Sequence, residues 1–187
     1  MKAFTENEKF TGLTTLKANS TFEDCEFRQC NFQSCKITDI NFINVHFIDC
    51  DLSLAVFRHV KWQQVSFTNC KLMGVKQPEI SKMLLSVKFI NCNLMMMHLE
   101  GLALQRAVFK SCNLKEAILI DCDLRESNFE DSHLAGALIH NCDLRKADFQ
   151  WATAYQIDPG HNQLKGAVFS ESGLSGLLQH LDIKINP

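Results

Sequence analysis

Large apolar residues recur at every fifth position over most of the chain. One series runs without interruption from Phe22 to Leu72 and a second from Phe89 to Phe149, and neither contains a polar residue. A slender residue, most often Cys, Ala, Val or Ser, stands two positions before almost every member. An α-helix repeats every 3.6 residues and a strand every two, so neither explains a period of five. The pattern predicts a coil in which each five-residue cell forms one side and points its slender and large residues inward.

Phenylalanine recurs among the large residues at intervals of twenty. The two runs are Phe27, Phe47 and Phe67, then Phe89, Phe109, Phe129, Phe149 and Phe169. Twenty residues make four cells, so each coil has four sides and equivalent residues stack on one another. We therefore predict an all-β solenoid, a right-handed quadrilateral β-helix whose coils lie about 4.8 Å apart. Each coil would be stabilised by burying its large residues against the next coil.

The rhythm breaks once in the middle of the chain. From Leu72 to Phe89 the interval is seventeen residues, three cells plus two, which places a break near residues 74–83. The segment Gln77-Pro78-Glu79 is the predicted site, because proline cannot donate a ladder hydrogen bond. A bulge or small loop with two extra residues fits the count, and so does a longer loop that replaces two or three cells.

Three regions follow from the rhythm. Residues 1–19 keep it poorly and are expected to form an irregular N-terminal cap. Residues 20–152 form the β-helix, and residues 153–187 form a final partial coil, a short helix and a strand, with a turn at Asp158-Pro159-Gly160. Caps are expected because open strand edges at the ends of a solenoid invite aggregation.

The C-terminal region carries a candidate dimer interface. Its apolar residues are spaced as one face of a short helix and then alternate as in a strand: Leu174, Leu177, Leu178, Leu181, Ile183 and Ile185. A short apolar helix at the end of a narrow rod has little core of its own to pack on. A symmetric homodimer joined through these residues would bury it. A monomeric cap is the simpler alternative.

Candidate catalytic and metal-binding groups do not change this interpretation. All nine cysteines occupy the slender position, where free cysteine behaves as a small buried hydrophobe rather than converging on an ion as zinc ligands do. The sequence has no P-loop, dinucleotide fingerprint or nucleophile elbow. The seven histidines are expected on the surface. We expect no catalytic residue, metal or cofactor, and hence no enzyme activity.

Charge is small in sum but uneven along the chain. Nineteen basic and twenty-one acidic residues give a net charge of -2. Between Ser111 and Asp182 there are eleven acidic and five basic residues, whereas the rest of the chain has ten acidic and fourteen basic. No apolar run is long enough to span a membrane, and the first residues lack a secretory signal. A cytoplasmic protein is expected.

The acidic residues of the second half form the candidate partner-binding surface. They are Asp121, Asp123, Glu126, Glu130, Asp131, Asp143 and Asp148. In a dimer joined at the C-termini, two acidic halves would meet in one central negative zone. An ordinary solvated surface is the alternative.

The five-residue cells resemble the pentapeptide-repeat family, whose pattern is A-(D/N)-L-x-x. Cys92-Asn93-Leu94, Cys122-Asp123-Leu124 and Ala147-Asp148-Phe149 are good matches, and the resemblance covers residues 20–151. The size and the C-terminal ending resemble the topoisomerase-protecting branch, which includes Qnr, MfpA, AlbG and McbG.

That resemblance implies a dimeric rod that mimics DNA, does not itself bind nucleic acid, and protects DNA gyrase or topoisomerase IV from a quinolone-like drug or a toxin. Duplex DNA carries dense, regular negative charge, so a surface evolved for DNA would attract an acidic rod of similar shape. A protein-interaction scaffold with an unrelated partner is the alternative.

Overall fold

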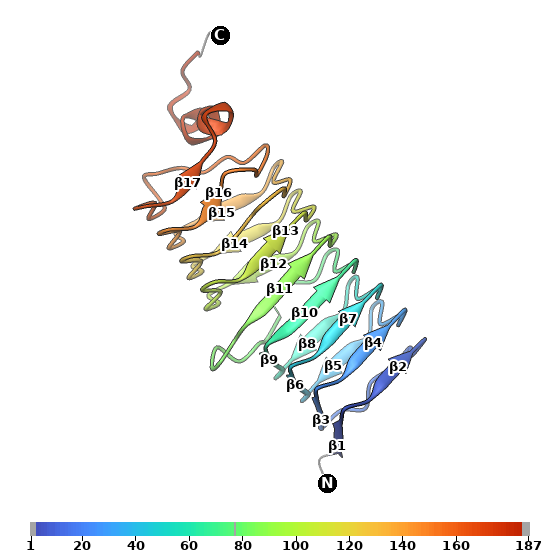
Figure 1. Cartoon of the computed structure of the whole chain (residues 1–187). Coiled ribbons are helices and arrows are strands. Elements are labelled where there is room, and N and C mark those ends of the chain that lie inside the picture. Colours follow the sequence, from blue (N-terminus) through green and yellow to red (C-terminus); the bar gives the residue numbers. More distant parts are fainter. Residues whose placement is uncertain (1–2, 77, 185–187) are drawn as a thin grey trace.

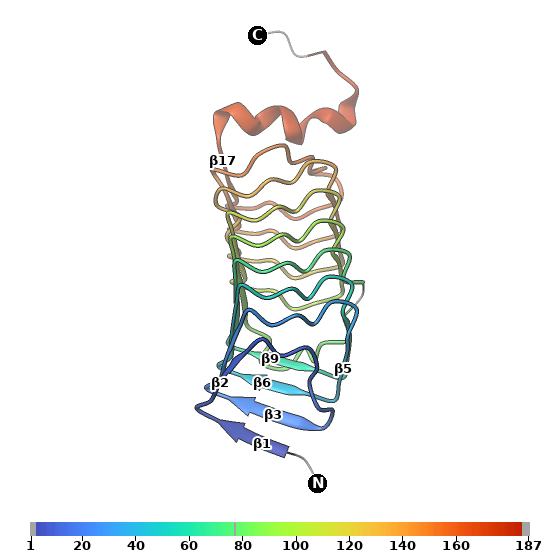
Figure 2. The same ribbon diagram turned by 90° about the vertical axis from the view of Figure 1, so that its right-hand side faces the viewer.

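The chain folds into a straight, four-sided rod of about eight stacked right-handed coils with a short helix at its C-terminal end (Figures 1 and 2). The computed structural model describes residues 3–76 and 78–184. Every strand pair among them is parallel, because each strand pairs with its equivalent in the next coil. The predicted fold class is confirmed. No described helix is long and apolar enough to cross a membrane.

Faces 2 and 4 are built largely from parallel sheets, face 1 is a sheet in its N-terminal half, and face 3 is held by single β-bridges. The C-terminal half of face 1 is also held by single bridges, which join Ala103 to Asp123, Asp123 to Asp143 and Asp143 to Gln163. Face 1 contains β1 (Ala3–Glu6), β3 (Ser20–Glu23), β6 (Asn41–Ile43) and β9 (Lys61–Gln63). Face 2 contains β2 (Lys9–Thr11), β4 (Glu26–Arg28), β7 (His46–Ile48), β10 (Val65–Thr68), β11 (Val87–Ile90), β13 (Val108–Lys110), β16 (Asp148–Phe149) and β17 (Val168–Phe169). Face 4 contains β5 (Lys36–Thr38), β8 (Val56–Arg58), β12 (His98–Glu100), β14 (Ile118–Ile120) and β15 (Leu138–His140). Face 3 is the column of bridges that runs from Asn31 to Thr153.

Nine phenylalanine rings form one continuous stack along the inner side of face 2. They are Phe10, Phe27, Phe47, Phe67, Phe89, Phe109, Phe129, Phe149 and Phe169. Neighbouring ring centroids lie 4.5–5.4 Å apart with interplanar angles of 6–20°. Each aromatic pair contributes about 0.5–1.5 kcal/mol beyond the burial of its surface. The stack therefore ties the whole length of the rod into a single core.

The slender position also has a hydrogen-bonding role. The Cys50 thiol donates to the Phe27 carbonyl oxygen at 3.3 Å and accepts the Cys30 N–H at 3.4 Å. Ser132 makes the equivalent pair of bonds at the same corner of a later coil. Burial raises the pKa of the Cys30 thiol. A small side chain that both donates and accepts satisfies the buried backbone where the chain turns.

The register locates the break in the rhythm. Val60 pairs with Ile80, twenty residues later, whereas Val65 pairs with Val87, twenty-two residues later. The two extra residues therefore lie within residues 81–86. This confirms that two residues are inserted and excludes a loop that replaces several cells.

The predicted position of the insertion, at Gln77-Pro78-Glu79, is wrong. Gln77 lies outside the described residues, and Ile80, which follows this segment, is still in the ordinary register. A proline removes one hydrogen-bond donor but adds no length to the coil, so it did not mark the insertion. The extra residues instead form an exposed turn that carries Met83 and Leu84.

The N-terminal segment is not an irregular cap. Strand β1 pairs with β3 and strand β2 pairs with β4, each seventeen residues apart, so this segment forms a first coil three residues shorter than the others (Figure 2). The rhythm is weak there because Thr5 stands where Phe22 and Phe42 stand in the next coils. Phe10 nevertheless continues the phenylalanine stack.

The C-terminal region differs from the prediction in part. A turn at Asp158-Pro159-Gly160 is present, with the Gly160 N–H donating to the Asp158 carboxylate at 2.7 Å. The helix is present but is 3-10 in type, in two pieces, η1 (Glu171–Leu177) and η2 (Gln179–Leu181). Ile183 is not in a strand, contrary to the prediction, and Ile185 lies outside the described residues.

The phenylalanine stack gives a direct test of what stabilises the rod. Phe109→Ala removes a fully buried ring from the middle of the stack and is expected to lower the free energy of unfolding by about 3–5 kcal/mol. Phe4→Ala is the matched control, because Phe4 is 60% exposed, and is expected to change it by less than about 0.5 kcal/mol. Urea unfolding followed by circular dichroism measures both. Equal effects would contradict the role of the stack.

Candidate protein-interaction surface

The packed interior leaves the outside of the rod as the place where a partner can bind. Eight of the nine cysteines are buried and Cys35 is half-buried. Within residues 3–76 and 78–184, no group of three or more His, Cys, Asp or Glu side chains is placed to hold a metal ion. The candidate site is therefore sought in the distribution of charge and exposed apolar residues over the four faces.

Three of the seven predicted acidic residues lie on face 1 and are paired with arginines. Asp123 accepts two hydrogen bonds from Arg125, at 2.8 and 2.6 Å. Asp143, one coil later, is bound in the same way by Arg145 and lies 3.6 Å from Arg125. Glu126 is the third of these residues. It accepts a hydrogen bond at 2.9 Å from an arginine of the preceding coil, Arg106.

These arginines remove the negative character of face 1. The Arg125 guanidinium lowers the pKa of Asp123 to about 2, and Arg145 lowers the pKa of Asp143. Both carboxylates are thus ionised and compensated at neutral pH. The C-terminal half of this face has three acidic residues against five basic ones, namely Arg106, Arg125, Arg145, Lys146 and Lys165.

The remaining acidic residues lie elsewhere, so the seven do not form one surface. Asp121 lies at the corner between faces 4 and 1 and accepts a hydrogen bond from Asn141. Glu130, Asp131 and Asp148 belong to face 2, where Glu130 pairs with Lys110 at 3.0 Å. No ion pair joins Asp131 or Asp148 to another described residue. The net negative surface of the C-terminal half therefore includes face 2.

An exposed tryptophan adjoins the acidic residues of face 2. Trp151 is 61% exposed, and Val168 on β17 is exposed as well. Trp151 is not among the surface residues predicted from the sequence. The five-residue rhythm contained the signal, because Trp151 stands two positions after the buried Phe149 and so at a corner. Exposed tryptophans are enriched among residues that dominate protein–protein binding.

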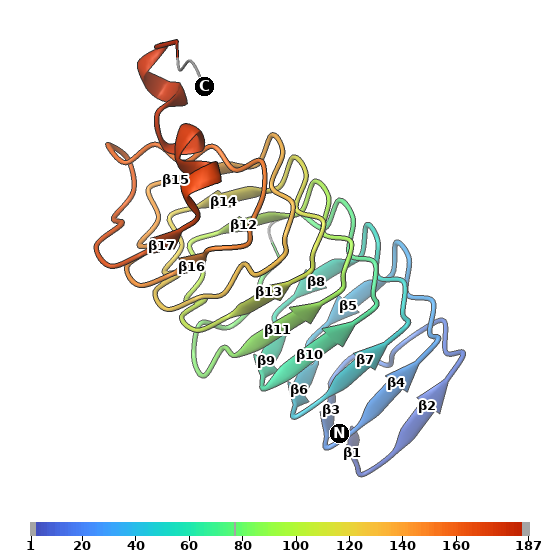
Figure 3. The ribbon, with the colours of Figure 1, turned by 45° about the horizontal axis from the view of Figure 1, so that its top comes forward.

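Three of the predicted dimer residues are exposed on the terminal helix, Ile183 is exposed just after it, and Ile185 lies outside the described residues. Leu174, Leu178, Leu181 and Ile183 are 37–55% exposed. Leu177 instead packs against the core of the rod. The helix lies across the end of the tube, so its outer side faces away from the coils (Figure 3).

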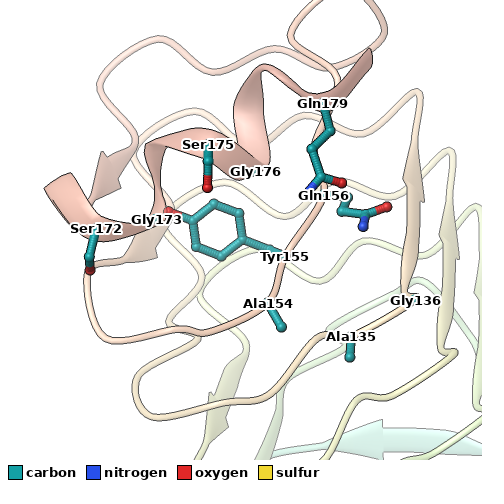
Figure 4. Close-up of a pocket in the computed structure, with 10 residues that line it drawn as sticks. All are labelled: Ala135, Gly136, Ala154, Tyr155, Gln156, Ser172, Gly173, Ser175, Gly176 and Gln179. Carbon is teal, nitrogen blue, oxygen red and sulfur yellow. The ribbon is translucent and has the colours of Figure 1, made fainter. Parts of the chain in front are cut away.

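Two glycines let this helix lie directly on Tyr155 (Figure 4). A Cβ atom on Gly173 would lie 2.1 Å from the Tyr155 hydroxyl oxygen, and one on Gly176 would lie 2.2 Å from its carbonyl oxygen. The Ile157 N–H donates to the Gly176 carbonyl at 3.0 Å. Tyr155 is buried against Phe149 and Phe169 at the end of the phenylalanine stack. The helix is thus fixed to the core, and a cavity of about 250 Å³ remains beside it.

A cluster of polar side chains adds a second attachment for the helix. The Asp158 carboxylate lies 2.6 Å from Nδ1 of His161 and 3.7 Å from Nε2 of His180, which belongs to η2. The Gly160 N–H, and after it His161, lower the pKa of Asp158. The carboxylate therefore stays ionised near neutral pH and can attract His180 toward the rod.

The comparison with protein families agrees with this geometry. The family described as the pentapeptide repeat region matches residues 20–80 and 82–158, most of the chain. The chain belongs to the pentapeptide-repeat family. None of the curated proteins matches it.

Solved pentapeptide-repeat proteins share the fold at low sequence identity. A structure of QnrB1, described as a plasmid-mediated fluoroquinolone resistance protein, is 18% identical, and the match covers 98% of both chains with a TM-score of 0.60. HetL from the cyanobacterium Nostoc sp. strain PCC 7120, described as involved in heterocyst differentiation regulation, is 16% identical. Its match covers 91% of this chain and 84% of HetL, with a TM-score of 0.65. Both likenesses concern the fold alone.

The glycine contacts predict which substitution detaches the terminal helix of this pentapeptide-repeat protein from the coils. Gly173→Ala would force the added methyl group into the Tyr155 ring, and we expect the helix to detach at a cost of about 1–3 kcal/mol. Amide hydrogen exchange of residues 171–181 should become faster while exchange in the coils stays unchanged. Ser175→Ala on the same helix is the control. A Gly173→Ala variant with unchanged exchange would contradict the contact.

Proposed function

We propose that this pentapeptide-repeat protein is a non-enzymatic, protein-binding rod that acts through its outer surface. The observation that carries the proposal is the packed interior, in which most inward residues between Ser20 and Ala152 are buried and the phenylalanine stack runs from Phe10 to Phe169. A tube filled in this way leaves no internal site for a substrate.

The partner that we propose first is a type II topoisomerase, either DNA gyrase or topoisomerase IV, which the rod would protect from a quinolone-like drug or a toxin. Three observations support this choice. The fold matches QnrB1 over 98% of both chains. A row of exposed apolar residues lies on the terminal helix, where a second copy can cover it. Face 2 carries Asp131 and Asp148 near that end, and neither forms an ion pair with another described residue. Such a partner implies a cytoplasmic protein.

The charge distribution narrows the proposed contact surface to face 2. Asp131 and Asp148 lie there beside the exposed Trp151 with no ion pair to another described residue, and Glu130 lies there paired with Lys110. Asp123 and Asp143 on face 1 are instead bound by arginines. In a dimer joined through the terminal helices, the C-terminal parts of the two copies of face 2 would lie near the centre of the double rod. Negative charge that is not already compensated is the part available to attract a basic DNA-binding surface.

The proposed dimer is tested by its oligomeric state. Leu178→Glu places a charge in the exposed apolar row and is expected to convert a dimer into a monomer, because a buried unpaired carboxylate is strongly unfavourable. Leu138→Glu, at a similarly exposed apolar residue on face 4, is the control and should leave the dimer intact. Light scattering after size-exclusion chromatography distinguishes the two. A wild-type protein that is monomeric at every concentration contradicts the proposal.

The proposed partner is tested with purified gyrase. We expect the rod to restore DNA supercoiling in the presence of a fluoroquinolone, or to inhibit supercoiling when added alone. Neutralising face 2 with Glu130→Gln, Asp131→Asn and Asp148→Asn should remove the effect, since these carboxylates would make the contact.

A matched control carries the same change of charge on face 1: Asp123→Asn, Glu126→Gln and Asp143→Asn. It should keep most of the activity, because these carboxylates already pair with arginines. If the wild-type rod affects neither the drug sensitivity nor the activity of the enzyme, the topoisomerase proposal fails. Equal loss in both triple variants would reject face 2 as the contact surface.

A scaffold with an unrelated protein partner is the second candidate. Two observations favour it. The mixed charges of face 1 make the rod as a whole a poor copy of DNA. HetL, whose description names a role in differentiation, shares the fold with a TM-score of 0.65.

A further inference from the structure

A polar concavity of about 530 Å³ lies on the rod where faces 1 and 2 meet, in the third to fifth coils. Its hydrogen-bonding side chains come from two columns of stacked residues: Asn44, Gln64 and Ser86 at the corner, and His46, Ser66 and Lys88 on face 2. Val65 and Ile90 complete the lining. The last coil of this region lies two coils before the coil that carries Glu130 and Asp131 on face 2.

Regular stacking and the insertion together build this concavity. Ser66 is in register with His46 in the preceding coil and with Lys88 in the following coil, on the adjacent strands β7, β10 and β11 (Figure 1). Ser86 is the last residue of the segment that contains the two inserted residues. The three side chains of face 2 therefore stand at intervals of one coil, about 5 Å, along one side of the concavity.

Lys88 gives the lining of the concavity a positive charge, and one carboxylate is nearby, because the Asn44 amide donates a hydrogen bond to Asp24. None of the eight described residues that line it is acidic, and no ion pair joins Lys88 to another described residue. His46 Nδ1 lies 2.7 Å from the Ser66 hydroxyl oxygen, which fixes both side chains. The nearest acidic residue in the same column, Glu26, lies one coil before His46 and is held by Arg28 at 2.6 and 3.1 Å.

We propose that this concavity binds a small anionic ligand, namely a phosphate ester. Lys88 would supply the charge, and the hydroxyl groups of Ser66 and Ser86 with the amide of Gln64 would donate hydrogen bonds to the phosphate and the organic part. The Asn44 amide already donates to Asp24 and would line the concavity without being a free donor. The volume falls within the range of about 300–1,000 Å³ typical of small-molecule sites and exceeds what a bare phosphate ion fills. The proposal does not depend on the topoisomerase proposal, because it uses none of the same residues.

Titration calorimetry with four probes tests the proposal on the intact protein. The probes are ribose 5-phosphate, inorganic phosphate, citrate and uncharged ribose. We expect ribose 5-phosphate to bind with a dissociation constant on the order of 1 mM or tighter. Ribose should not bind, because it offers no charge to Lys88. Chemical-shift changes at the amides of Ser66 and Lys88 should place the ligand in the concavity.

Two lysine variants make the test specific. Lys88→Gln is expected to weaken binding of ribose 5-phosphate about tenfold or more, the effect of losing a charged hydrogen bond. Lys36→Gln on face 4, at another exposed lysine without an ion pair to a described residue, should bind as the wild type does. Melting curves confirm that both variants fold.

Three results would overturn the proposal: unchanged affinity in Lys88→Gln, equal binding of ribose, or no saturation by any anionic probe. Equal affinity for inorganic phosphate and ribose 5-phosphate would retain an anion site and reject the ester. Tighter binding of citrate than of either phosphate would identify the ligand class as a carboxylate and would also reject the ester.

Discussion

The structure depends on the stacking of equivalent residues from successive coils inside a narrow tube. Each five-residue cell contributes only two inward-pointing side chains to the interior of this tube. Each coil must return to the same place after four sides, so each large residue meets its equivalent in the next coil. The phenylalanine stack along face 2 is the clearest result of this constraint, because neighbouring rings remain nearly parallel through all nine members of the stack. A core of this kind leaves no room for a ligand inside the tube, so the residues that contact a partner must lie on its outer surface.

The five-residue rhythm was sufficient to predict which residues are buried, but not how many residues each coil contains. It fixed the four-sided coil and the buried position of the cysteines, since burial at that position requires only a slender side chain. It could not place the insertion, because counting from Leu72 to Phe89 gives the number of extra residues without their location. The first coil was missed because Thr5 takes the place of a large apolar residue, although Phe10 keeps the stack.

The charge of each face was less predictable, because the net charge of a sequence segment does not show which acidic and basic residues share a face of the rod. Asp123 and Arg125 are two residues apart and flank the buried Leu124, so they lie on one face and neutralise each other. The same holds for Asp143 and Arg145. The positions of these pairs in the cell could have been read from the sequence, whereas the bond between Arg106 and Glu126 needed the twenty-residue register.

The two ends of the rod are built differently, and the difference bears on the proposed dimer. At the N-terminal end the first coil is simply shorter, whereas at the C-terminal end Tyr155 closes the core and two glycines hold a helix against it. The helix turns most of its leucines away from the rod and leaves them exposed. A rod that exposes apolar residues on a helix at its C-terminal end is suited to pairing with a second copy through that end.

Inter-strand nuclear Overhauser effects in solution test the stacked register most directly. Backbone contacts between equivalent residues should appear at an offset of twenty within the regular coils, as between Phe27 and Phe47, and at twenty-two across the insertion, as between Phe67 and Phe89. Other offsets within these regular coils, or a pattern of helical contacts between residues three and four apart, would contradict the four-sided rod and everything inferred from it.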